Sequence, residues 1–122
     1  MAYIDLDEIS INFHVPARGN AGAVARHRLD VLAEQMDRAT LARVRLLVSE
    51  LVNRAALEPQ CTSVPVAVTV SRKGVRTTVR DHPDALNGSS RRLDWALFLV
   101  RRMSDRWGTA SGVWFEIDHP RN

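Results

Sequence analysis

The sequence predicts an α+β fold, in which a mixed or antiparallel sheet carries about three helices on one face as a two-layer sandwich. Two observations support this prediction. Segments in which apolar and polar residues alternate are typical of half-buried strands, and segments with apolar residues every three or four positions are typical of amphipathic helices. Along the chain they follow the order strand, helix, helix, strand, strand, helix, strand. The 122 residues, 45% of them apolar, are expected to form one domain spanning 1–122.

The first strand is predicted at residues 9–15, where apolar and polar side chains alternate up to Pro16. An amphipathic helix is predicted at about 20–36, with Asn20 as its N-cap. Residues 37–40 are expected to form a short connection.

The second helix is predicted at 41–57 and ends before Pro59, because proline disfavours helix in the residue that precedes it. Its apolar face packs on the core. The residues at helical spacing on that face are Val44, Leu47, Val48, Leu51 and Ala55.

A hairpin follows, with strands at 64–70 and 75–79 joined by a turn at 72–74. Pro65, near the start of the first of these strands, indicates an edge strand or a strand's first residue. Residues 81–92 are predicted to form a short loop.

A third helix is predicted at about 91–106, closed by Trp107 and Gly108. Gly112 then turns the chain into a last alternating strand at 113–118.

Composition excludes several classes of function. The net charge of +3 comes from scattered arginines, with Lys73 as the only lysine, so direct DNA binding is not expected. No run of about 18 apolar residues predicts a membrane span. The acidic N-terminus does not resemble a secretory signal. The lone Cys61 suits a reducing cytosol, so we expect a cytoplasmic protein.

Glu50 and Arg54 are the residues of this chain that most strongly indicate a functional site. They lie four positions apart at the border of the apolar face, so their side chains are neighbours on the helix. The simple interpretation is a surface ion pair worth a few tenths of a kcal/mol. The alternative depends on what the surrounding residues resemble.

Residues 49–55, Ser-Glu-Leu-Val-Asn-Arg-Ala, resemble the N-box of the GHKL ATPases, and most closely the small anti-sigma-factor serine kinases of the RsbW/SpoIIAB type. The resemblance covers nearly the whole chain and implies a Bergerat-type α/β sandwich. The other matching segments are 13–16, 46–52, 79–81, 99–100, 105–108 and 113–116.

The resemblance implies roles for particular residues. Glu50 matches the glutamate that orients or activates water or the acceptor hydroxyl, and Asp81 matches the aspartate that binds the adenine amino group. The magnesium-binding asparagine is replaced by Arg54. A guanidinium repels Mg²⁺, by about 4 kcal/mol per pair of unit charges at about 4 Å and an effective dielectric of 20. Asn53 is rotated by about 100° around the helix and is no easy substitute.

The glycine motifs of the family are also missing. After Asp81 the chain continues with His82 and Pro83, and proline has no amide hydrogen to offer a phosphate. Trp95 and Ala96 stand where the resemblance calls for small, flexible residues. We therefore expect a degenerate ATP site in which Arg54 neutralises Glu50 and, with Trp95, blocks the pocket.

The expected function is regulation by protein binding, with a sigma factor or a STAS-type anti-anti-sigma protein as partner and without a cofactor. The first two helices and the exposed arginines would present the binding surface. An active ATP-dependent serine/threonine kinase that phosphorylates an anti-anti-sigma factor is the alternative. It would need ATP and Mg²⁺ and would use Arg54 as a bidentate phosphate clamp. A homodimeric scaffold is the third interpretation.

Overall fold

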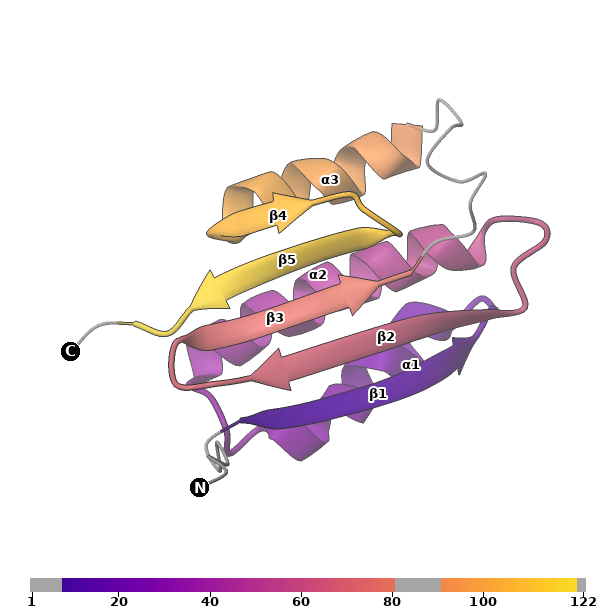
Figure 1. Cartoon of the computed structure of the whole chain (residues 1–122). Coiled ribbons are helices and arrows are strands. Elements are labelled where there is room, and N and C mark those ends of the chain that lie inside the picture. The colour runs from indigo at the N-terminus through magenta and orange to yellow at the C-terminus, as the bar shows by residue number, and fades with distance from the viewer. Residues whose placement is uncertain (1–7, 81–90, 121–122) are drawn as a thin grey trace, which may run out of the picture.

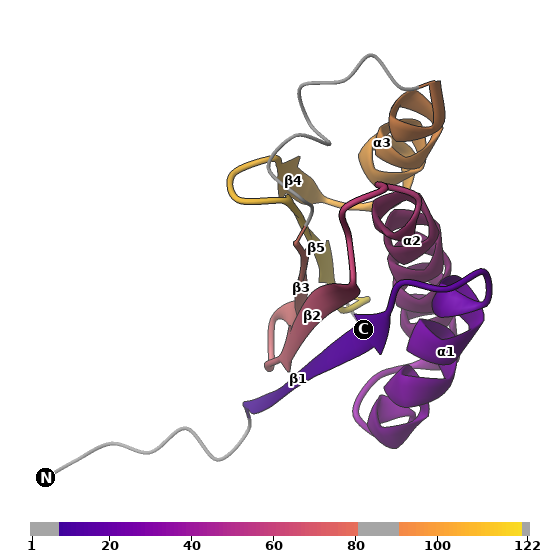
Figure 2. The same ribbon diagram turned by 90° about the vertical axis from the view of Figure 1, so that its right-hand side faces the viewer.

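The computed structural model describes residues 8–80 and 91–120, with side chains of the last helix described from residue 95 onward. The elements follow the order β1 (Ile9–Pro16), α1 (Ala21–Arg28), the 3₁₀ helix η1 (Leu29–Leu32), α2 (Arg38–Ala56), β2 (Ser63–Val70), β3 (Gly74–Val79), α3 (Arg91–Met103), β4 (Arg106–Gly108) and β5 (Val113–Asp118). The sheet has the order β1-β2-β3-β5-β4, and every neighbouring pair is antiparallel (Figure 1). All three α-helices cover the same face of the sheet (Figure 2). The predicted two-layer α+β sandwich is confirmed.

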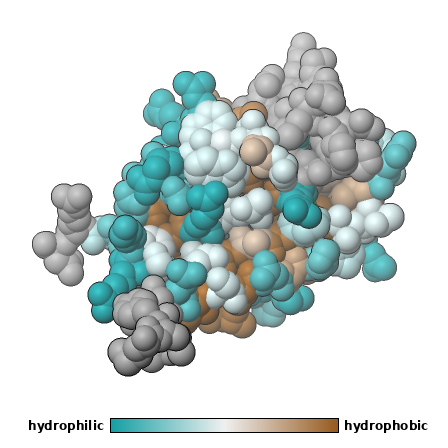
Figure 3. All heavy atoms as spheres, viewed as in Figure 1, coloured by the Kyte–Doolittle hydropathy of each residue, from teal (hydrophilic) through white to brown (hydrophobic). Residues whose placement is uncertain are grey.

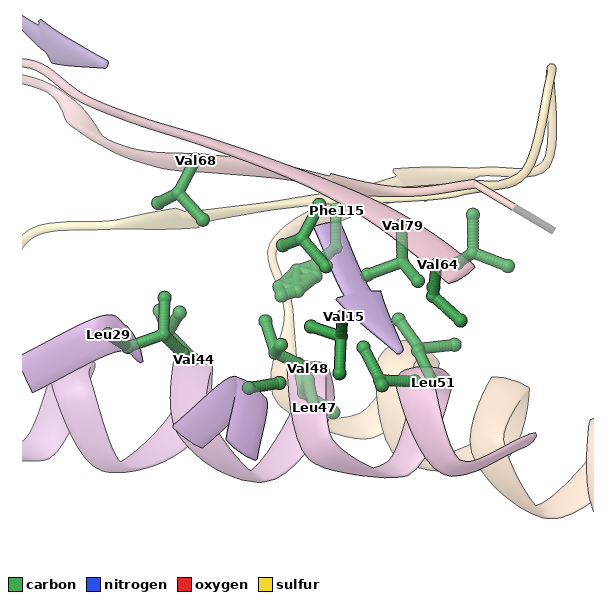
Figure 4. Packing of buried hydrophobic residues seen from close by; sticks show 14 of the residues in the cluster. Val15, Leu29, Val44, Leu47, Val48, Leu51, Val64, Val68, Val79 and Phe115 are labelled. Atoms are coloured by element: carbon green, nitrogen blue, oxygen red, sulfur yellow. The ribbon is translucent and has the colours of Figure 1, made fainter. Parts of the chain in front are cut away.

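The core lies between the two layers, and α2 contributes more of its helical side than α1 or α3 does (Figure 4). Alternate residues of β1, β2, β3 and β5 point from the sheet toward it, as a period of two requires. The largest fully buried side chains are Phe115, Leu29, Leu32, Leu47, Leu51, Ile117, Val15, Val44, Val48, Val52, Val64 and Val68.

The first helix is shorter than predicted. It ends at Arg28, and the chain continues as the 3₁₀ helix η1, with turns up to Met36. Leu29 and Leu32 are both buried, and their spacing of three residues suits a 3₁₀ helix, whose repeat is about three residues per turn. Asn20 stands at the N-cap position, but its side chain makes no capping hydrogen bond.

The second helix begins earlier than predicted, because residues 37–40 form its start rather than a connection. Asp37 is the N-cap, and its carboxylate accepts a hydrogen bond from the backbone N–H of Thr40 at 3.3 Å. It also accepts a hydrogen bond from the Thr40 hydroxyl, which lowers the pKa of Asp37 below its ordinary value. The pattern Asp-x-x-Thr was a capping signal that apolar periodicity alone missed.

Strand β4 was not predicted. The third helix ends at Met103, and Arg106 to Gly108 pair with β5 instead of closing the helix. Three residues are too few to show an alternating pattern, so the signal for this strand lies in its partner strand. Within residues 8–80 and 91–120, no helix has the length and apolar character needed to cross a membrane.

Pro65 does not lie in an edge strand, because β2 pairs with β1 on one side and β3 on the other. The carbonyl of Pro65 accepts a hydrogen bond from the Arg80 N–H at 3.0 Å, just past the last paired residue of β3. The proline therefore stands at the end of the β2–β3 ladder, where a missing N–H disturbs little.

Candidate functional site

Glu50 and Arg54 lie on the flank of α2 that faces α3. Helix α2 runs between α1 and α3 in the helical layer and contacts both (Figure 2). Four residues correspond to a rotation of about 40° around an α-helix, so Glu50 and Arg54 share one flank. Asn53 is rotated from Arg54 by about 100° and binds α1 on the other side. The structure thus brings Glu50 and Arg54 to one flank and separates Asn53 from them.

Arg54 is buried, with 8% of its surface exposed, whereas Glu50 is half-buried. A buried arginine is unusual, because its charge must leave water. No hydrogen bond or ion pair joins Arg54 to Glu50, although both residues are described. The expected neutralisation of Glu50 by Arg54 through a direct contact is not seen among the described residues, and the role of Arg54 as a blocking residue stays a prediction.

Asn53 has a structural role between two helices. Its Oδ1 accepts a hydrogen bond from the backbone N–H of Gly22 at 2.8 Å. A Cβ at position 22 would stand 2.5 Å from the Asn53 amide nitrogen, so only glycine leaves room for this contact. The sequence places glycine and asparagine 31 positions apart, with no pattern that links them, so this pairing was missed.

The residues of this flank do not fit a magnesium ion. Mg²⁺ prefers oxygen ligands in octahedral geometry, and Arg54 brings a guanidinium to this flank instead. The amide oxygen of Asn53 is engaged with α1. In the described part of the chain, no three His, Cys, Asp or Glu side chains are placed to hold a metal. Asp81, the expected adenine ligand, lies outside the described residues.

Trp95 is exposed rather than enclosed, with 55% of its surface accessible. Ala96 and Val100 occupy the buried side of α3, so Trp95 falls on the outward side of the helix. Its ring stacks on Phe98, with the ring centroids 5.8 Å apart and the planes 17° apart. Residues 81–90, which would border the expected nucleotide pocket, lie outside the described residues, so the blocking role of Trp95 stays a prediction. Phe98, one helical turn later, was not singled out from the sequence, although its spacing from Trp95 was a sufficient signal.

The open face of the sheet, opposite the helices, carries paired charges. Figure 3 shows a mixture of hydrophilic and hydrophobic side chains on this side of the molecule. Glu116 binds Arg106 Nε at 2.8 Å and Arg76 Nη1 at 3.1 Å, and Asp118 also pairs with Arg106. Hydrogen bonding to Arg106, helped by Arg76, lowers the pKa of Glu116. These side chains line a hollow of about 670 Å³, but their charges are matched within the sheet.

Comparison with known proteins supports the fold. No protein-family model matches this chain, and no curated protein matches its sequence. Among solved structures, the chain is similar to the crystal structure of the RsbU and RsbW domains of Rv1364c from Mycobacterium tuberculosis, with a TM-score of 0.70 and 21% sequence identity. The similarity covers 93% of this chain and 33% of that one, so the chain spans about a third of that structure's length. The α+β sandwich is thus an RsbW-like fold.

Proposed function

We propose that this chain is a regulator of the anti-sigma-factor kinase-like type that acts by protein binding, with lost or impaired ATP binding. The burial of Arg54 on the α3-facing flank of α2 carries the proposal. In the family that the sequence resembles, this helix position holds the magnesium ligand. A buried guanidinium there disfavours the cation that ATP brings with it.

Two further observations support the loss of nucleotide chemistry. Asn53, the residue before Arg54 on α2, accepts a hydrogen bond from the Gly22 N–H of α1, so its amide oxygen is already engaged. The residues directly after Asp81, which are His82, Pro83, Asp84 and Ala85, include no glycine that would allow backbone amides to approach phosphates, and Gly88 is the only glycine before the next helix. What the family resemblance still implies is the partner: a sigma factor or a STAS-type anti-anti-sigma protein.

Isothermal titration of the purified chain with Mg-ATP tests the proposal. We expect no saturable heat and a Kd weaker than about 1 mM, which corresponds to less than about 4 kcal/mol of binding. Micromolar binding would overturn the proposal.

The variant Arg54→Asn isolates the contribution of the guanidinium. We expect it to remain without ATP hydrolysis, because the glycine-containing phosphate loops are still absent. Phosphate release assays on the parent and the variant provide the measurement. Turnover in the single variant would mean that Arg54 alone holds the site inactive.

An active serine kinase is the second candidate, and one observation favours it. The half-buried Glu50 makes no ion pair with Arg54 or with any other described residue, which favours a role for its carboxylate as a base. Transfer of radiolabel from ATP to a STAS-domain protein would establish this function. The matched control is Glu50→Gln, which keeps the shape of the side chain and removes its charge.

A further inference from the structure

We infer that the outer face of α3, together with the adjoining part of α2, binds an acidic amphipathic helix of a partner protein. The inference rests on the proposed function as a protein-binding chain and specifies where the partner binds. The exposed aromatic pair Trp95 and Phe98 is the observation that leads to it.

The aromatic pair forms a stripe along α3 with Arg102. The three residues are spaced by three and four positions, so they lie on one side of the helix. Trp95 and Phe98 are 55% and 49% exposed, and their rings stack on each other. The guanidinium of Arg102 lies 5.7 Å from the centre of the Phe98 ring. Ring stacking and the cation–π contact hold these side chains in place before any partner arrives, which lowers the entropy cost of binding.

Helix α2 extends this surface. Leu46 and Leu57 are 37% and 55% exposed, and eleven residues correspond to about three helical turns, so both leucines lie on one side of α2. That side points away from the sheet, because the core residues of α2 occupy the side facing the sheet. Helices α2 and α3 lie side by side and antiparallel (Figure 1). Apolar side chains on two adjacent helices, with aromatic anchors, suit a partner helix that lies along them.

Charge selects the kind of partner. Arg43, Arg101 and Arg102 are exposed and make no ion pair in the described part of the chain, while Glu50 is the carboxylate on this side of α2. Carboxylates on a partner would meet these unpaired cations, whereas a second copy of this chain would bring the same excess of positive charge against itself. The surface therefore favours an acidic helix over self-association.

Selection from a displayed library of random peptides of about 18 residues, long enough for five helical turns, tests the inference. We expect the selected peptides to share apolar residues at helical spacing, with aspartate and glutamate on their flanks. Binding of the synthesised peptides, measured by fluorescence anisotropy, should weaken about tenfold or more in the double variant Trp95→Ala/Phe98→Ala. The matched control is Trp107→Ala, which removes an exposed tryptophan from β4 and should bind like the parent.

A second variant separates charge from apolar contact. Arg101→Glu/Arg102→Glu should weaken the same peptides, and high salt should reduce the difference between this variant and the parent. Circular dichroism of each variant shows whether the fold is kept.

Three results would overturn the inference. They are the absence of any enriched peptide, enrichment of basic peptides, and binding that the loss of Trp95 and Phe98 does not change. Concentration-dependent dimerisation that the same double variant abolishes would assign this face to a second copy and also contradict the inference. None of these results depends on nucleotide, so the ATP titration and the peptide selection can fail independently.

Discussion

At the scale of single residues, Gly22 and Asn53 join α1 to α2. The Asn53 amide accepts the Gly22 N–H at 2.8 Å, and the missing Cβ of Gly22 makes room for that amide. Such a pair is coupled, because the asparagine supplies the hydrogen bond and the glycine supplies the space. It also engages the Asn53 amide oxygen with α1.

We predict that Gly22→Ala lowers the free energy of unfolding in the parent chain and raises it when Asn53 is also replaced by alanine. In the parent chain, Gly22→Ala should destabilise the folded protein by about 1–2 kcal/mol, because the added Cβ displaces the Asn53 amide and breaks its hydrogen bond. In an Asn53→Ala background the clash is gone, and the higher helix propensity of alanine should stabilise by up to about 1 kcal/mol. Urea denaturation of the four proteins in this double-mutant cycle measures the coupling.

Gly19→Ala is the control for this cycle. A Cβ at position 19 meets no atom within 4 Å, so we expect a change within about 0.5 kcal/mol. Equal effects of Gly22→Ala in both backgrounds would show that the contact with Asn53 does not couple the two positions.

At the scale of elements, β4 forms only because it pairs with β5. Arg106 pairs with Glu116 and Asp118 across the two strands, and the Gly108 backbone lies against the Trp114 ring. A short strand at the edge of a sheet gains little from backbone pairing alone, so side-chain contacts across the strands determine where it forms.

We predict that Arg106→Gln lowers the free energy of unfolding at pH 7 and that this loss shrinks in acid. Arg106 lowers the pKa of Glu116, so the ionised carboxylate stabilises the folded state above the unfolded pKa of about 4.3. That contribution is lost as the pH falls through the lowered folded pKa, because the carboxylate is then protonated in both states. Urea denaturation of both proteins at pH 7 and near pH 3 measures the difference. A loss of stability that is independent of pH would mean that Arg106 contributes by packing, not by charge.

At the scale of the whole molecule, one core between helices and sheet holds the two layers together. Residues from α2 face residues from β1, β2, β3 and β5 across this core (Figure 4). Separating the helices from the sheet would therefore expose the apolar side chains of both layers to water. A side chain on the inner side of α2 should therefore matter much more than a side chain of the same type on its outer side.

We predict that Leu51→Ala destabilises the protein by about 2–5 kcal/mol, because it leaves a cavity in the core. Leu57→Ala, at the end of the same helix, should change stability by no more than about 0.5 kcal/mol. The two leucines are 1% and 55% exposed, respectively. Thermal and urea unfolding provide the measurement, and similar losses for both variants would contradict this description of the core.

The sequence by itself determined the fold class and the inner face of nearly every element. Alternating valines in β2 and the apolar positions of α2 are local patterns, and burial follows from their periods of two and 3.6 residues. The same patterns could not reveal β4, which is too short to have a period, or the end of α1, where a 3₁₀ turn buries Leu29 and Leu32 equally well.

The side-chain contacts of the candidate site were decided only by the tertiary structure. Helical spacing brought Glu50 and Arg54 to one flank, but it could not show that Arg54 is buried while Glu50 makes no ion pair with the residues that the structure describes. It also could not show that Trp95 faces outward beside Phe98, or that Asn53 binds Gly22. Position along a helix fixes the direction in which a side chain leaves the backbone. Its contacts depend on which helices and strands pack around it, and those come from distant parts of the chain.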